Sequence, residues 1–168
     1  MAIRFAILTI SDRSSQGIRP DTSGAALKTA IEQTGDSIIK TEIIPDDLEL
    51  IKKKLTDWCD DDEIDVLLTT GGTGFSPRDN TPEASLAVIE RLAPGIAEAM
   101  RLESLKITPH AMLSRSVAGI RKRTLIINFP GSPKAAIENF NVVLPVLSHA
   151  VDLLQERPTA EAGHRKPG

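Results

Sequence analysis

The segment VLLTTGGTGFSPRDNTPEA, residues 66–84, contains the signals that decide the fold. It begins with a short apolar run, continues with three glycines in four positions, and ends in Thr81-Pro82, a typical helix start. A buried strand, a turn and a helix in this order form the repeating unit of an α/β sheet. Because ordered glycine costs backbone entropy, the cluster at 71–74 indicates an unusually tight turn or a close approach to the backbone.

Apolar strands alternate with helical segments through the rest of the chain. We expect strands at 4–10, 37–44, 66–70, 116–121 and 124–129, and helices at 24–34, 46–59, 82–91, 96–106 and from 133 onward. In the helix at 46–59, Leu48, Ile51, Leu55 and Trp58 form one apolar stripe. The pattern predicts an α/β fold with a mostly parallel sheet and helices on both faces.

The composition is that of a globular domain and argues against several classes of function. The chain of 168 residues fits one domain, and the Pro, Gly and charges from Arg157 onward suggest a loose tail at 157–168. A net charge of −3 and an aromatic content of 3% argue against a nucleic-acid partner. No stretch resembles a signal peptide or approaches the roughly 18 apolar residues that cross a bilayer. We therefore expect a cytoplasmic protein that contacts no membrane.

Three polar segments each follow directly after a predicted strand. They are Ser11-Asp12-Arg13, Pro45-Asp46-Asp47 and Gly71-Gly72-Thr73-Gly74. In an open parallel sheet, ligands bind beyond the carboxyl ends of the strands, so these segments should converge at one edge. The glycine segment suits a phosphate, because successive bare N–H groups can point at one anion. A tight turn without a ligand explains the same glycines equally well.

The aspartates beside these turns allow two interpretations. Asp46 lies where a helix N-cap belongs, with Glu49 three residues later, so taken alone it is more easily explained as a cap. Asp79 is not needed as a cap, because Thr81 can fill that role. Mg²⁺ takes one or two carboxylates together with substrate phosphates, and two aspartates at neighbouring strand ends could supply them.

With these motifs in order, the sequence resembles the molybdopterin-binding family of molybdenum cofactor biosynthesis. Within that family it is similar to the molybdopterin adenylyltransferase (MogA) branch, which is related to the N-terminal domain of gephyrin. The matching stretches, in order over about residues 3–155, are AILTISDR, DTSG, IIPDD, TTGGTGFSPRDNTPEA and LSRSVAGIRKRTLIINFPGSPKA. The resemblance implies a three-layer α/β domain at 1–156, usually trimeric, that binds ATP, Mg²⁺ and molybdopterin.

The resemblance also implies roles for individual residues. Asp46 and Asp79 match the two aspartates that the adenylyltransferases require for catalysis, where they hold Mg²⁺ against the substrate phosphates. The phosphate-binding positions are Gly71, Gly72, Thr73 and Gly74, and the other pocket positions are Asp12, Ser114, Pro130, Gly131 and Ser132. The implied reaction transfers AMP from ATP to the terminal phosphate of molybdopterin and releases pyrophosphate. A homotrimer and transfer of the product to a molybdenum-insertion protein are implied as well.

Two alternatives follow from the same resemblance. A sister branch of MoaB-like proteins shares DTSG and the compact C-terminal helix but often lacks an aspartate at the position of Asp46. The first alternative is therefore a molybdopterin-binding protein without adenylylation activity. The second, weaker alternative is a trimeric scaffold, which the relationship to gephyrin suggests. The presence of Asp46 favours the enzyme.

Overall fold

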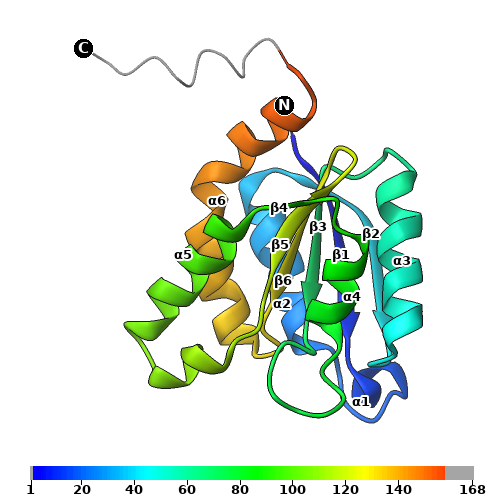
Figure 1. Ribbon diagram of the computed structural model, residues 1–168, viewed down its shortest axis with the longest axis vertical. Coiled ribbons are helices and arrows are strands. Elements are labelled where there is room, and N and C mark those ends of the chain that lie inside the picture. Colours follow the sequence, from blue (N-terminus) through cyan, green and yellow to red (C-terminus); the bar gives the residue numbers. More distant parts are fainter. Residues whose placement is uncertain (1, 158–168) are drawn as a thin grey trace.

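Six strands form one sheet at the centre of the computed structural model, which describes residues 2–157 (Figure 1). Their order across the sheet is β2-β1-β3-β6-β5-β4. They are β1 (Arg4–Ile10), β2 (Ser37–Ile44), β3 (Val66–Thr70), β4 (Arg91–Leu92), β5 (Ala118–Arg121) and β6 (Thr124–Phe129). Strands β2, β1, β3 and β6 are parallel, whereas β5 and β4 extend the sheet antiparallel. The predicted α/β fold with a mostly parallel sheet is confirmed.

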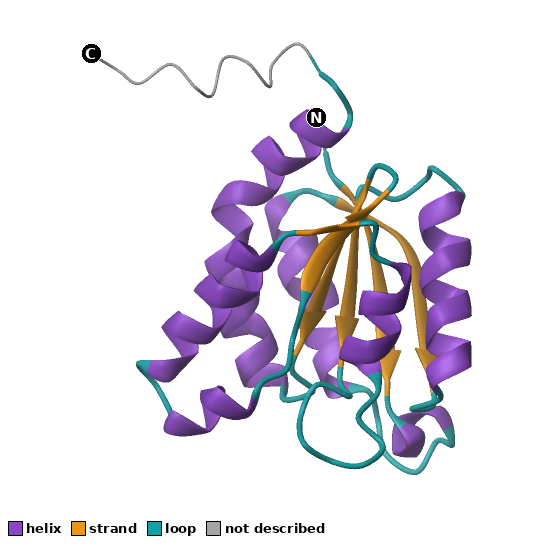
Figure 2. Cartoon of the chain, viewed as in Figure 1, coloured by secondary structure: helices purple, strands orange, loops and turns teal. Residues whose placement is uncertain are grey.

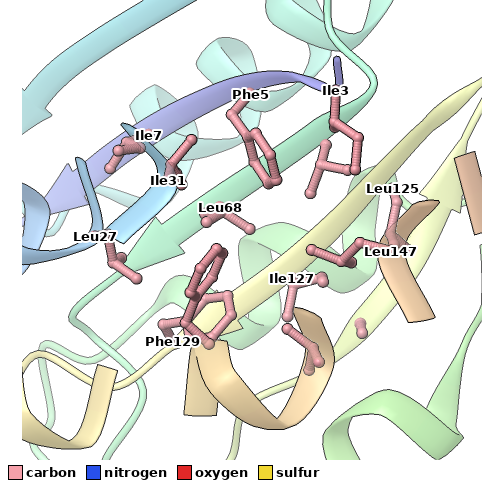
Figure 3. Packing of buried hydrophobic residues seen from close by; sticks show 14 of the residues in the cluster. Ile3, Phe5, Ile7, Leu27, Ile31, Leu68, Leu125, Ile127, Phe129 and Leu147 are labelled. Atoms are coloured by element: carbon pink, nitrogen blue, oxygen red, sulfur yellow. The ribbon is translucent and has the colours of Figure 1, made fainter. Parts of the chain in front are cut away.

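Helices cover both faces of this sheet (Figure 2). They are α1 (Asp12–Ser15), α2 (Thr22–Thr34), α3 (Leu48–Asp60), α4 (Thr81–Val88), α5 (Pro94–Leu105), α6 (Pro133–Leu154) and the 3-10 helix η1 (Pro109–Leu113). Side chains of α2, α5 and α6 pack on one face around Phe5 and Leu68 (Figure 3), and those of α3 and α4 pack on the other around Leu8 and Leu67. Because successive strand residues point to opposite faces, strands buried on both sides are mainly apolar along their whole length.

Three predicted features of the helices are corrected by the structure. Helix α3 begins at Leu48, and its N-cap is Asp47, whose Oδ1 accepts the Leu50 N–H at 2.8 Å. The cap interpretation of Asp46 is therefore wrong. Thr81 is the first residue of α4 rather than its cap, because its buried hydroxyl donates to the Gly71 carbonyl at 2.9 Å. Helix α4 also ends at 88 instead of 91, since the chain then pairs with β5 as β4.

The carboxyl ends of the parallel strands all point to one end of the molecule, at the bottom of Figure 1. Helix α1 and the wide loop between β3 and α4 lie at this end, and the chain begins at the opposite end. Of the predicted tail, only Arg157 falls within the described residues, and 158–168 lie outside them. None of the helices within 2–157 has the length and apolarity needed to cross a membrane.

Candidate active site

The glycine turn after β3 leaves no room for side chains at two positions. Gly71 and Gly72 have φ of 100° and 64°, in the left-handed region that favours glycine. A Cβ on Gly71 would lie 2.2 Å from the carbonyl oxygen of Ile10. A Cβ on Gly72 would lie 2.4 Å from Thr81 Oγ1 and 2.9 Å from Asp46 Oδ1. The turn is therefore tight, and protein atoms from β1, α4 and the segment after β2 approach it closely.

This turn is held in place largely through its carbonyl groups. The carbonyls of Gly72 and Thr73 accept the backbone N–H groups of Thr81 and Arg115, at 3.1 and 3.0 Å. The N–H groups of residues 72–74, in contrast, donate no hydrogen bond to any residue within 2–157. Successive N–H groups that a turn leaves unengaged can point at one anion, so this turn is a candidate binding place for an anion.

Four aspartates, Asp12, Asp21, Asp46 and Asp79, line one cavity of about 490 Å³ beside the turn. Asp12 and Asp46 bind each other reciprocally across 34 positions of sequence. The Asp12 N–H donates to Asp46 Oδ2 at 3.0 Å, and the Asp46 N–H donates to Asp12 Oδ1 at 3.1 Å. Asp79 lies in the loop that follows the glycines, where its Oδ2 accepts the Ser76 N–H at 3.1 Å. The fold thus brings the two aspartates predicted for catalysis to the same cavity.

The aspartates of this cavity differ in how well their negative charge is compensated. Partial burial raises the pKa of Asp46, and the like charges of Asp12 and Asp79 raise it further. A hydrogen bond from the Asp12 backbone lowers this pKa but does not cancel the increase. The hydrogen-bonded guanidinium of Arg78 lowers the pKa of Asp12 instead. A cation placed between Asp46 and Asp79 would therefore relieve repulsion that the free protein contains.

A smaller cavity of about 270 Å³ adjoins the other end of the glycine turn. Its lining is mainly apolar and includes Ala97, Met100 and Ala111 from α5 and η1. The predicted binding residues divide between the two cavities. Asp12, Asp46, Gly71, Gly72, Asp79 and Gly131 line the larger one, and Thr73, Gly74, Ser114 and Pro130 line the smaller one. Ser132, the N-cap residue of α6, lines neither of them.

Two arginines of the site were not predicted from the sequence. Arg78 follows Pro77 in the loop after the glycines and binds Asp12 through two nitrogens. Arg115 lies 36 positions after Asp79, yet its Nη2 donates to the Asp79 carbonyl and its Nε to the Gly74 carbonyl, both at 2.7 Å. Arg115 also forms an ion pair with Glu83 of α4. Proximity to Asp79 in the sequence could have indicated Arg78, but no local pattern indicates the long-range partners of Arg115.

The acidic residues do not form a complete metal cage by themselves. Within residues 2–157, no group of three or more His, Cys, Asp or Glu side chains is arranged to hold a metal ion. Any divalent cation bound here would need ligands from a substrate or from water in addition to the aspartates.

Comparison with known proteins identifies relatives that share one molybdopterin-binding domain. Residues 6–149 match the model of the family described as "Probable molybdopterin binding domain". Gephyrin of Dictyostelium discoideum is 48% identical over 162 residues, which cover 90% of this chain, although the match spans only 22% of gephyrin. The molybdopterin adenylyltransferase of Helicobacter pylori strain J99 is 42% identical over 154 residues, covering 90% of this chain and 88% of that enzyme.

A solved structure agrees with these sequence matches. The crystal structure of the molybdopterin biosynthesis enzyme MoaB from Thermus thermophilus superposes with a TM-score of 0.87 at 47% identity. The superposition covers 93% of this chain and 98% of that structure. Sequence, sheet topology and the glycine turn therefore lead to one conclusion: the chain belongs to the molybdopterin-binding domain family of molybdenum cofactor biosynthesis.

Proposed function

We propose that the protein is a molybdopterin adenylyltransferase, which transfers AMP from ATP to the terminal phosphate of molybdopterin and releases pyrophosphate. One observation carries the proposal: Asp46 and Asp79 line the same cavity as Gly72, the first of three successive residues whose N–H groups are unengaged by residues 2–157. This arrangement offers both carboxylates for a cation and donors for phosphate oxygens. The adenylyltransferase of H. pylori, which this chain matches over 88% of the enzyme, supports the same assignment.

The larger cavity fits Mg²⁺ bound together with the phosphates of ATP. Mg²⁺ uses one or two carboxylates, substrate phosphates and waters rather than an all-protein cage. Asp46 and Asp79 supply two carboxylates, and the raised pKa of Asp46 reflects a charge that lacks full compensation. When bound, Mg²⁺ would neutralise phosphate charge and polarise the phosphate that is attacked.

The reaction needs no activated side chain, because phosphate oxygens are already nucleophilic at neutral pH. An oxygen of the molybdopterin phosphate attacks the α-phosphorus of ATP, forming one P–O bond. The bond from the α-phosphorus to the bridging oxygen breaks, and pyrophosphate leaves with the electron pair. The N–H groups of residues 72–74 hold phosphate oxygens in line for this displacement, so the chain acts through positioning and charge stabilisation.

The smaller cavity gives the site a place for a ring system. Met100, Ala97 and Ala111 offer apolar contacts, and the hydroxyls of Ser104, Ser114 and Ser116 supply polar ones. This combination suits the planar heterocycle of a substrate, whose phosphate end would then reach the glycine turn. The turn borders both cavities, so it can hold phosphates of substrates entering from either side.

We extend the proposal to the assembly and setting of the enzyme. By the family resemblance, the protein forms a homotrimer and passes the adenylylated pterin to a molybdenum-insertion protein. We propose a cytoplasmic setting, where ATP is available. Large apolar side chains such as Leu102, Ile107 and Met112 are 62%, 57% and 66% exposed on and near α5 and η1, which favours an assembly that covers some of them. Sedimentation equilibrium tests the trimer.

The decisive experiment follows product formation. The protein is incubated with molybdopterin, ATP and Mg²⁺, and adenylylated pterin and pyrophosphate are both quantified. Asp46→Ala and Asp79→Ala should each lower turnover by at least about 100-fold, the size of the loss when one electrostatic stabiliser is removed. Both variants should keep the fold and the binding of molybdopterin.

A matched control and one alternative outcome complete the test. Asp57→Ala removes an exposed aspartate of α3 whose partner is Lys53, and it should leave turnover unchanged. Unchanged turnover in Asp79→Ala would remove the metal-site assignment. If the wild-type protein binds molybdopterin but forms neither product, the MoaB-like alternative without adenylylation replaces the proposal.

A further inference from the structure

Arg78 holds an unusual position at the larger cavity. Its Nη2 lies 2.9 Å from Asp12 Oδ1, and its Nε contacts Asp12 Oδ2, so the guanidinium binds the carboxylate with two nitrogens. The same Nη2 reaches the Asp46 carbonyl at 3.3 Å. The side chain of Arg78 is nevertheless 64% exposed, whereas that of Asp12 is 30% exposed. Arg78 is therefore open to solvent while it contacts both Asp12 and the backbone of Asp46.

A phosphate chain entering this cavity meets several carboxylates. Asp12, Asp21, Asp46 and Asp79 all line it, and a chain of phosphates carries further negative charge. If Asp46 and Asp79 held Mg²⁺, part of this charge would be offset, but the charge of Asp12 would remain. A guanidinium matches the geometry of phosphate oxygens as well as that of a carboxylate, again through two parallel bonds.

We propose that Arg78 is a phosphate-binding residue of this site, exchanging its two bonds to Asp12 for two bonds to the phosphate chain of the nucleotide. The inference rests on the proposed function and extends it. In the free protein Asp12 keeps the guanidinium directed at the cavity, and the arriving phosphates take it over. Asp12 retains its reciprocal backbone bonds with Asp46 throughout, so the exchange need not displace the catalytic carboxylate.

Because Arg78 is exposed, breaking its ion pair with Asp12 costs little free energy. Ion pairs in contact with water contribute little to stability, because water and salt compensate each partner when they separate. Two other arginines, Arg13 and Arg19, line the cavity, but within residues 2–157 neither side chain has an ion pair or hydrogen bond that holds it toward the aspartates. Arg78 is the arginine that the fold already orients.

Calorimetric titration with inorganic pyrophosphate in the presence of Mg²⁺ tests the exchange without turnover. Arg78→Ala should raise the Kd for pyrophosphate roughly tenfold or more, as expected for a lost charged hydrogen-bonded pair. Arg78→Lys should recover only part of the affinity, since lysine cannot bind with two nitrogens in a plane. Arg123→Ala is the control of equal charge, because Arg123 is an exposed arginine directly before β6, at the end of the strand away from the cavity. This variant should bind pyrophosphate with the affinity of the wild type.

Asp12→Asn gives the sharper result. Asparagine keeps an acceptor for the Asp46 N–H but loses the charge that holds Arg78. Pyrophosphate should therefore bind about two- to fivefold more tightly, the range of an exposed ion pair, in addition to any gain from removing a repelling charge. The Asp12 charge repels pyrophosphate whether or not Arg78 is present, but only a protein with Arg78 also gains from release of the ion pair. Asp12→Asn should therefore increase the affinity for pyrophosphate less in the Arg78→Ala background than in the wild type.

Two outcomes overturn the inference: wild-type affinity for pyrophosphate in Arg78→Ala, or an equal gain from Asp12→Asn in both backgrounds. If the first outcome comes with weaker binding of molybdopterin by Arg78→Ala, Arg78 belongs to the pterin phosphate instead of the nucleotide. None of these results depends on product formation. Absence of adenylylated pterin with the wild-type protein would instead reject the proposed function.

Discussion

Substitution of Gly72 by alanine tests whether the glycine turn positions Asp46, the aspartate that we propose for catalysis. Gly72 has a φ of 64°, and an added Cβ would lie 2.4 Å from Thr81 Oγ1 and 2.9 Å from Asp46 Oδ1. Thr81 cannot turn away easily, because it is fully buried and its hydroxyl is bonded to the Gly71 carbonyl. The turn or the Asp46 side chain must move instead.

The size of the effect follows from two separate terms. A left-handed conformation costs a residue with a Cβ about 1–2 kcal/mol, which lowers the Tm of a domain of this size by about 2–4 °C for each kcal/mol. The contact with Thr81 adds a displacement, since 2.4 Å is about 1 Å short of an ordinary contact at 3.4 Å. A misplacement of about 1 Å near reacting groups can cost roughly 100-fold in rate.

Gly35→Ala separates the two terms. Gly35 ends α2 with a φ of 81°, but no atom lies within 4 Å of an added Cβ, so this variant carries the backbone strain alone. Both variants should melt a few degrees below the wild type, while only Gly72→Ala should lose about 100-fold in adenylyl transfer measured by pyrophosphate release. If the turnover of Gly72→Ala stays within about threefold of that of Gly35→Ala, close packing at the turn does not position the site.

Three further predictions concern side chains around the site and the core. Arg115→Ala should lower kcat more than it raises the KM for molybdopterin, because it releases the loop that carries Asp79, and Arg115→Lys should restore part of kcat if the contact to that loop is what matters. Asp47→Ala removes the α3 cap and should cost about 1 kcal/mol in denaturant unfolding while turnover stays at the wild-type level. Asp65 is fully buried; burial alone would raise its pKa, but the bonds from Arg4 lower it overall. Asp65→Ala should therefore lower the free energy of unfolding by about 3 kcal/mol at neutral pH. That contribution is complete above about pH 4 and is lost as the pH falls through the lowered pKa, so urea unfolding of the two proteins should converge in acid.

Strands β1, β3 and β6 were predictable because they are buried on both faces. The predicted bounds of β1, β2, β3 and β6 agree with the structure. Three of them are short, mainly apolar runs, whereas β2 is a partly exposed edge strand in which pairs of isoleucines flank polar residues. Strand β4 was missed, because Arg91 and Leu92 are exposed and too few to show a period. Its strand character comes only from pairing with Gly119 and Ile120 of β5. A long-range backbone contact of this kind leaves no local trace in the sequence.

The neighbouring residues Asp46 and Asp47 show where local reasoning about the site ends. Both follow a strand and precede a helix, and aspartate is a preferred cap at either position. Only the structure shows that Asp47 caps α3, while Asp46 turns to the Asp12 backbone and the cavity. The one-residue difference is set by the path of β1 and α1, which lies 34 positions earlier in the chain. The family resemblance selected Asp46 where the local pattern favoured a cap.

The geometry of the glycine turn also explains why the sequence supported two interpretations equally, a tight turn and a phosphate-binding loop. A tight turn and an anion-binding loop look like alternatives in the sequence, yet here one geometry produces both. The carbonyls of Gly72 and Thr73 are used to tie the turn to α4 and to Arg115, and this use directs the chain so that the N–H groups of residues 72–74 stay unengaged by residues 2–157. A side chain at Gly72 would enter the space of Asp46. The packing that makes glycine necessary is therefore the same packing that sets a carboxylate beside free backbone donors, which is the combination that a metal-bound phosphate requires.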